Sequence, residues 1–221
     1  MKTIKGLMIK DLLQLKSYKK TLLVFMFVFI ASAMAQEHTR NVLAIMITLG
    51  FGMFSIATFS YDEMAKADRY ILTLPLTRKE VILAKYALVI ASTVIGAIFG
   101  ILITILLNYA IQKQIPDIGE IIGVGIGGIF GVGTVQAIQI PCIYKFGAEK
   151  GRLQVFIFVL IFAFILGGIV FIGEKMGLDT VNNYFMNNMI KFLPIFLLAM
   201  TMLIYYISYK IAYKIYRNSS F

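Results

Sequence analysis

The chain has 221 residues, of which 60% are hydrophobic, and its mean hydropathy is +0.86. A soluble domain of this length does not bury so large an apolar fraction, so the composition excludes an ordinary soluble protein. The net charge is +10, but the 21 Lys and Arg lie in short blocks between apolar runs, which argues against a nucleic-acid-binding surface.

The first 20 residues form a basic segment in which apolar side chains recur at helical spacing. The apolar face would consist of Ile4, Leu7, Met8, Leu12 and Leu15. The lysines that lie mostly elsewhere are Lys5, Lys16, Lys19 and Lys20. This pattern predicts an amphipathic helix on the membrane surface, with its lysines toward anionic lipid. A cleavable secretory signal is the alternative for residues 1–35, although its basic region would be twenty residues long.

The rest of the chain is a series of apolar runs, close in size to the ~20 residues that cross a hydrocarbon layer of ~30 Å. They predict an all-α integral membrane protein with six spans, forming one domain over residues 1–221. The predicted spans are residues 21–35, 41–60, 83–111, 119–144, 153–173 and 192–210.

The positions of Lys and Arg predict the orientation of these spans. If the N-terminus is inside, 17 of the 21 Lys and Arg fall on inner segments. The four on outer loops are Arg40, Lys113, Lys175 and Lys191. Because short loops rich in Lys and Arg stay in the cytoplasm, both termini are expected there.

The polar segment between the second and third predicted spans contains two capping-box patterns. Ser60 with Glu63 predicts that a short helix begins after Ser60, and Pro75 would stop it. Thr77 with Glu80 predicts the start of the helix that becomes the third span. The short helix would have one apolar and one charged side, so it is either a membrane-surface helix or a docking element for a soluble partner.

The fourth predicted span carries two groups of small or polar residues. The glycines at four-residue spacing, which are expected to pack against another helix, are Gly123, Gly127 and Gly131. The candidates for lining a transport pathway are Thr134, Gln136 and Gln139. Hydrogen bonding between helices is at least as good an interpretation of Gln136 and Gln139. The middle of each predicted span lacks charged residues, which argues against an ion or proton relay.

The sequence contains no pattern for catalysis or nucleotide binding. An ATPase would need a glycine-rich loop that ends in Gly-Lys-Ser/Thr, and no such string occurs. The only histidine, His38, falls in a predicted outer loop, and no serine has a nearby base, so an intramembrane enzyme is the weakest hypothesis. We expect no catalytic residue, metal site or cofactor on this chain. A channel or a membrane scaffold is the other alternative to a transporter.

Two stretches carry a resemblance to a known family. The first comprises Tyr61-Asp62-Glu63, Asp68-Arg69-Tyr70, Leu74-Pro75, Thr77-Arg78-Lys79-Glu80 and Lys85-Tyr86. The second is Pro141 with the run from Lys145 to Arg152. Together with the order of the spans, they resemble bacterial ABC-2 type transporter permeases, in particular the small six-span group without a fused ATPase. This resemblance covers essentially the whole chain.

The resemblance implies the permease half of an ATP-driven exporter in the bacterial plasma (inner) membrane. Two permeases, identical or related, would form a dimer with two cytoplasmic ABC ATPase subunits that hold ATP and Mg²⁺. The short helix after the second span would be the coupling helix, and the N-terminal helix would support the same interface. Some relatives are associated with export of amphipathic or antimicrobial peptides. The implied ATPase-coupling residues are Asp62, Glu63, Asp68, Arg69, Tyr70, Pro75, Arg78, Lys79 and Glu80.

Overall fold

The computed structural model describes residues 2–16, 19–71, 73, 76–113, 118–151, 153, 157 and 183–218, and every regular element within them is a helix. The helices are α1 (Lys2–Lys16), α2 (Lys19–Ala35), α3 (Glu37–Met64), α4 (Ala67–Ile71), α5 (Arg78–Gln112), α6 (Ile118–Phe146) and α8 (Asn183–Asn218). The predicted span at residues 153–173 lies almost entirely outside the described residues.

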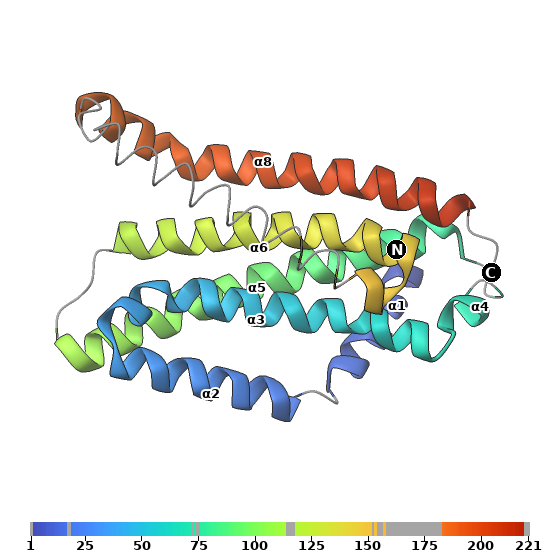
Figure 1. Ribbon diagram of the computed structural model, residues 1–221, viewed down its shortest axis with the longest axis horizontal. Helices are drawn as coiled ribbons and strands as arrows, with labels where there is room; N and C mark the ends of the chain where they lie inside the picture. Colours follow the sequence, from blue (N-terminus) through green and yellow to red (C-terminus); the bar gives the residue numbers. More distant parts are fainter. Residues whose placement is uncertain are drawn as a thin grey trace.

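The long helices α2, α3, α5, α6 and α8 run alongside one another, and α1 and α4 lie at one end together with both chain termini (Figure 1). Within the described residues, four stretches are long and apolar enough to cross a membrane: Val42–Met64, Arg78–Ile111, Ile118–Phe146 and Leu193–Asn218. The pair α1 and α2, bent by 65°, makes a fifth candidate if it is one broken span. Four of the six predicted spans therefore coincide with helices that are long enough to cross, and the first, residues 21–35, lies in α2 of the bent pair.

The capping box predicted at the start of the third span is confirmed. Thr77 is extended and its side chain accepts a hydrogen bond from the backbone N–H of Glu80, while Glu80 Oε2 accepts the backbone N–H of Thr77 at 2.9 Å. These bonds satisfy N–H groups that the first turn of a helix leaves without partners. Local sequence therefore sets where α5 begins.

The prediction of a second capping box, at Ser60 and Glu63, is wrong, because α3 continues through both residues to Met64. A capping box forms at the start of a helix, where the first N–H groups have no partner within the helix. No proline or glycine interrupts the chain between Met53 and Met64, and the break comes only at Lys66, with φ +48°. The short helix α4 therefore begins later than the sequence indicates.

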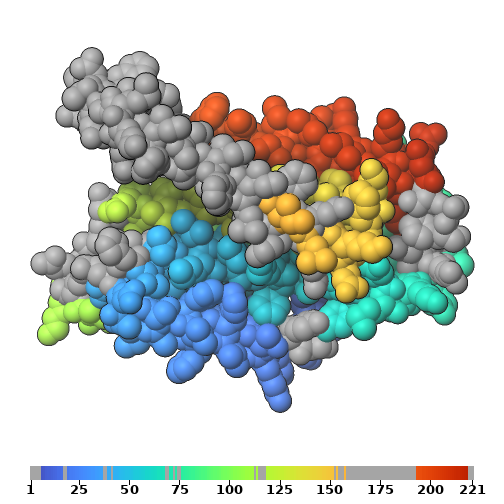
Figure 2. All heavy atoms as spheres, in the orientation of Figure 1, coloured from blue at the N-terminus to red at the C-terminus, as the bar shows by residue number. Residues whose placement is uncertain are grey.

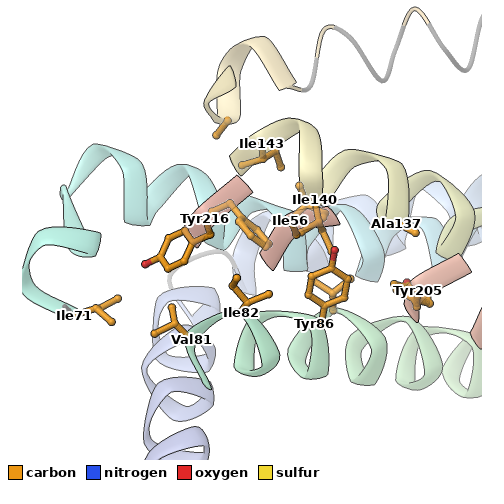
Figure 3. Packing of buried hydrophobic residues seen from close by; sticks show 14 residues of the cluster. Ile56, Ile71, Val81, Ile82, Tyr86, Ala137, Ile140, Ile143, Tyr205 and Tyr216 are labelled. Carbon is orange, nitrogen blue, oxygen red and sulfur yellow. The ribbon is translucent and has the colours of Figure 1, made fainter. Parts of the chain in front are cut away.

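A cluster of apolar side chains fills the space between α3, α5, α6 and α8 near the end that carries α4 (Figure 3). It includes Tyr86 of α5, Ile140 of α6 and Tyr216 of α8, which are at most 5% exposed. The rings of Tyr144 and Tyr216 meet edge to face with centroids 5.2 Å apart. Since aromatic side chains bury large areas and prefer such geometry, this cluster holds four helices together at one end.

The closest approach of a glycine to the backbone of another helix joins α5 to α3 and does not involve the predicted glycine face of α6. A Cβ on Gly100 of α5 would lie 2.7 Å from the carbonyl oxygen of Ala44 in α3. At Gly123, Gly127 and Gly131 no described atom lies within 4 Å of such a Cβ. The α6 glycines that approach neighbouring helices are Gly125, Gly128 and Gly133. Four-residue spacing identifies a stripe, but the rotation of the helix decides which stripe meets a neighbour.

Large apolar side chains stay exposed along the flanks of the bundle, where α2 and α8 form its borders (Figure 2). Phe27 of α2 and Met202 of α8 are 73% and 74% exposed. Water does not tolerate continuous apolar faces of this kind on a folded monomer, whereas lipid does. The exposed surface therefore fits a multi-pass membrane protein.

Candidate functional site at the charged end of the bundle

Figure 1 shows that α1 and α4 lie at the end of the bundle that carries both termini, and the elements that meet there bring exposed basic side chains with them. They come from the end of α1, the α3–α4 link, the start of α5 and the ends of α6 and α8, and include Lys16, Lys66, Lys79, Lys145, Lys214 and Arg217. Among the described residues, the opposite end carries Arg40 at the start of α3, Lys113 after α5 and Lys191 in the first part of α8. The two ends of the molecule therefore differ strongly in positive charge.

Four charged side chains from three helices meet near this basic end: Lys10 and Asp11 of α1, Asp62 of α3 and Lys85 of α5. The Nζ of Lys85 lies 3.0 Å from Asp11 Oδ2 and 2.6 Å from Asp62 Oδ2. The Nζ of Lys10 lies 2.7 Å from Asp62 Oδ1 and 3.1 Å from Asp11 Oδ1. Each lysine contacts both carboxylates, so this ion network ties α1 to α3 and α5.

The ion network is buried, and its positive and negative charges balance. Asp11, Asp62 and Lys85 are only 1%, 7% and 6% exposed. Gln14 donates a further hydrogen bond to Asp62 at 3.1 Å, and Lys85 donates one to Thr58 at 3.3 Å. Buried charges are tolerated when they are paired, and every charge of this network lies beside one of opposite sign.

Lys10 is the most exposed member of the network, with 34% of its side chain accessible. Burial alone would lower the pKa of Lys10, but the hydrogen bond to Asp62 and the charges of Asp11 and Asp62 outweigh it and raise this pKa above its ordinary value. Lys10 therefore stays protonated at neutral pH. The ring of Phe59, whose centroid lies 5.0 Å from Lys85 Nζ, covers another side of the network.

The family resemblance implies a coupling role for Asp62. The sequence does not indicate that Asp62 pairs with a residue of α1. Two signals were present in the sequence. Asp11 is the only acidic residue among the first 36, and Lys85 stands within an otherwise apolar stretch of α5. A lone charge in an apolar or basic environment calls for a partner, but the sequence does not say which helix provides it.

Glu63 connects the end of α3 to the turn that follows α6. Its Oε2 accepts a hydrogen bond from the backbone N–H of Ala148, and a Cβ on Gly147 would lie 2.7 Å from its Oε1. Gly147 has φ +86°, a conformation that glycine adopts without strain. The structure therefore joins the two stretches that the sequence singled out, and Figure 2 shows the segments around them in contact on one face.

Arg78 and Lys79 contact the end of α8. Arg78 Nη1 donates to the carbonyl oxygens of Tyr216 and Arg217 at 2.9 and 2.6 Å. These carbonyls belong to the last turn of α8, where a cation also interacts favourably with the helix dipole. Lys79 lies over the ring of Tyr213 at 5.6 Å from its centroid. Both predicted coupling residues therefore have structural contacts within the chain, as Glu80 has in its capping box.

α4 is anchored on one side and exposed on the other. Ile71 is 6% exposed and belongs to the apolar cluster, whereas Tyr70 is 72% exposed. Met64, just before the link, is 82% exposed. The side chains of Asp68 and Arg69 and the whole of Pro75 lie outside the described part of the chain. Met64 and Tyr70 are therefore the exposed large apolar side chains in the described part of the predicted coupling segment, and Lys66 is exposed between them.

A pocket of about 230 Å³ lies between α4, the end of α3, the start of α5 and the end of α6. Asp62, Glu63 and Lys85 contribute its polar lining, and Ile71 and Tyr144 contribute apolar lining. No three His, Cys, Asp or Glu side chains within the described ranges are arranged to hold a metal ion.

Gln136 lies at the centre of a second, uncharged network. It is 2% exposed, and its Oε1 accepts hydrogen bonds from Thr93 of α5 at 2.8 Å and Tyr205 of α8 at 2.7 Å. A Cβ on Gly52 of α3 would lie 2.4 Å from Gln136 Nε2, so the glycine makes space for the amide. These contacts from four helices favour the interhelical interpretation of Gln136 over a pathway-lining role.

The other two pathway candidates make no comparable contact between helices. Thr134 donates a hydrogen bond to the carbonyl of Phe130 in its own helix at 2.7 Å. Gln139 is half-buried on α6. A separate link between α5, α6 and α8 comes from Ser208, which donates to the Ala137 carbonyl and bonds with the Tyr86 hydroxyl at 2.6 Å.

Comparison with known proteins identifies one family. A family model described as ABC-2 family transporter protein matches residues 6–217, nearly the whole chain. No curated protein matches the sequence.

Proposed function

Because the chain belongs to the ABC-2 family of transporter proteins, we propose that it is an exporter permease driven by separate cytoplasmic ABC ATPase subunits. One observation carries this proposal: several elements meet at the basic end of the bundle. They are α1, α3, α4, α5 and the turn after α6. A partner that binds there contacts α4 directly and reaches the spans through side-chain contacts.

The distribution of charge supports the orientation that this function requires. Lys66 lies between α3 and α4 and Lys79 at the start of α5, at the same end as both termini. Positively charged connections remain on the cytoplasmic side, so the basic end faces the cytoplasm. The soluble ATPases would then meet α4.

The contacts of α4 and α3 suggest how movement reaches the spans. Tyr70 and Met64 offer exposed contact surface, and Ile71 transmits displacement of α4 to the apolar cluster. Glu63 connects the end of α3 to Ala148, and Asp62 connects it to α1 and α5. Closure of the ATPases on ATP would shift these elements together and repack the bundle between inward- and outward-accessible states.

The proposed dimer rests on the family resemblance, and the proposed cargo rests on the uncharged interior of the helix bundle. Transport would require a second permease, identical or related, because ABC ATPases act as pairs. The buried polar groups in the middle of the bundle, such as Thr93 and Gln136, are uncharged. Such an interior suits amphipathic peptides, including antimicrobial ones, better than small ions.

The first test replaces Tyr70 with Ala and measures ATPase binding and ATP-dependent transport in nanodiscs that contain the permease and its co-expressed ATPase. Exposed aromatic side chains dominate many interfaces, so we expect at least about tenfold weaker ATPase binding. The matched control is Tyr206→Ala, since Tyr206 is 59% exposed on α8. Unchanged ATPase binding and transport in Tyr70→Ala would overturn the assignment of α4.

The second test determines which side of the membrane α4 faces. Lys66 and Lys113 are both exposed, at opposite ends of the bundle, and each is replaced by Cys in a Cys142→Ala background. We expect a membrane-impermeant maleimide to label Lys113→Cys in intact cells and Lys66→Cys only after the cells are opened. Labelling of Lys66→Cys in intact cells would refute the proposed coupling mechanism.

A further inference from the structure

α1 presents two opposite stripes of side chains, each at spacings of three and four residues. The stripe toward the bundle is Leu7, Lys10, Asp11 and Gln14, whose members are buried or half-buried. The stripe away from the bundle is Ile9, Leu12, Leu13 and Lys16, all exposed. The sequence-based apolar face is therefore divided, because Leu7 packs inward and Leu12 points outward.

This arrangement reverses the pattern of an amphipathic helix that faces water. Such a helix buries its apolar stripe against the protein and exposes its polar one. In α1 the three inward polar residues bond within or beside the ion network, while Ile9, Leu12 and Leu13 are 46%, 55% and 61% exposed. A helix with this distribution is stable when the medium around its outer stripe is apolar.

Along the chain, the outer stripe of α1 is followed by an exposed surface of α2. Lys16 closes the stripe, Lys19 and Lys20 open α2, and all three are exposed. Beyond them, Leu23 and Val24 are each 63% exposed. Three lysines therefore lie between two exposed apolar surfaces, which is the arrangement that places ammonium groups at the level of lipid headgroups.

We propose that α1 is seated in the cytoplasmic leaflet and that Lys16, Lys19 and Lys20 form a binding site for the headgroup phosphates of anionic phospholipids. The ion network connects this site to α3, because Lys10 and Asp11 of the same helix bind Asp62 and Lys85. The charge of the leaflet thereby sets the position of α1 relative to the end of α3. The orientation rests on the proposed function, whereas lipid binding needs no ATPase.

The position of α1 is tested with a spin label on Leu13→Cys, in a Cys142→Ala background, in nanodiscs without ATPase. We expect the label to be accessible to dissolved oxygen and protected from a water-soluble nickel chelate. A label on Lys66→Cys is the matched control and should be accessible to nickel. Access of nickel to Leu13→Cys would show that this face is exposed to water, as a docking surface for a soluble protein would be. Spin–spin broadening would show that two copies of the chain meet at this face. Either result would overturn the proposal.

The lysine site is tested by titrating phosphatidylglycerol into phosphatidylcholine nanodiscs and measuring lipid retention by native mass spectrometry. Each juxtamembrane lysine contributes about fivefold to binding of anionic lipid, so the triple variant Lys16→Gln, Lys19→Gln and Lys20→Gln should lose most of the preference for phosphatidylglycerol. The control removes the same charge from exposed lysines elsewhere, with Lys145→Gln, Lys150→Gln and Lys214→Gln. An equal loss in both variants would indicate diffuse attraction by net charge and overturn the site, as would no loss in the first.

The connection to α3 is tested in the same nanodiscs by the distance between spin labels on Leu13→Cys and Met64→Cys. We expect phosphatidylglycerol to narrow or shift this distance distribution in the otherwise unaltered chain. The lipid effect should vanish in the Lys16, Lys19 and Lys20 triple variant. A distribution that does not respond to phosphatidylglycerol would overturn the proposed connection. These outcomes are independent of the tests of ATPase binding, so either proposal can fail alone.

Discussion

The two polar networks of this bundle hold helices together by different means. At the basic end, two lysines and two aspartates join α1, α3 and α5 through direct ion pairs. Farther along the bundle, Gln136 joins α5, α6 and α8 through neutral hydrogen bonds, with α3 packed against its amide. The first arrangement is sensitive to the loss of any one charge, whereas the second can lose one hydroxyl and retain its packing.

Removal of one charge from the ion network should have the largest effect. Lys85→Ala leaves Asp11 and Asp62, which are 1% and 7% exposed, with Lys10 as the only cation paired with both among the described side chains. Loss of one partner from a buried ion pair destabilises proteins by about 3–5 kcal/mol. The unfolding free energy in mixed micelles with a denaturing detergent measures this change.

The control for this prediction is Lys150→Ala, which removes an exposed charge and should change stability by less than about 0.5 kcal/mol. Combining Lys85→Ala with Asp62→Asn should restore part of the lost stability, because one lysine and one aspartate then remain. If Lys85→Ala were as stable as the control, the ion network would not contribute to the stability of the fold.

Overpacking the neutral network should have the next largest effect. In Gly52→Ala the new Cβ would lie 2.4 Å from Gln136 Nε2 and 2.7 Å from Val132 Cγ1, so both must shift. Insertion of a methyl group into a packed interior costs about 1–3 kcal/mol. Gly127→Ala is the matched control, because no described atom lies within 4 Å of its added Cβ. Since alanine favours a helix more than glycine does, this control should be neutral or more stable, and equal losses in both would contradict the packing at Gly52.

The smallest effect is expected for Tyr205→Phe, which removes one hydrogen bond to Gln136 and keeps the ring. Hydrogen bonds between helices in membranes contribute about 0.6 kcal/mol on average. Tyr206→Phe, one residue along on the exposed face of α8, should change nothing measurable. A loss in Tyr205→Phe as large as that in Lys85→Ala would remove the difference between the charged and the neutral network.

Local sequence was sufficient where the determining contacts lie within a few residues. Hydropathy located the long helices α3, α5, α6 and α8, since each apolar run must satisfy its own backbone hydrogen bonds in lipid. Thr77 and Glu80 lie three residues apart, and their capping box formed as the spacing indicates. The similar pair Ser60 and Glu63 did not cap a helix, because nothing interrupts α3 before it and Glu63 bonds to a distant segment instead.

Tertiary structure alone decided which side chains of the candidate site meet. Asp11 and Lys85 are more than 70 residues apart in the sequence, and no periodicity relates them, yet their charged atoms lie 3.0 Å apart. The partners of a helix face depend on the rotation and depth of that helix relative to neighbours far away in the chain. The sequence by itself therefore determined that the chain lies in a membrane and where its described long helices run. The assembled bundle decided that α1 turns its charges inward, because buried charges are stable only beside partners of opposite sign.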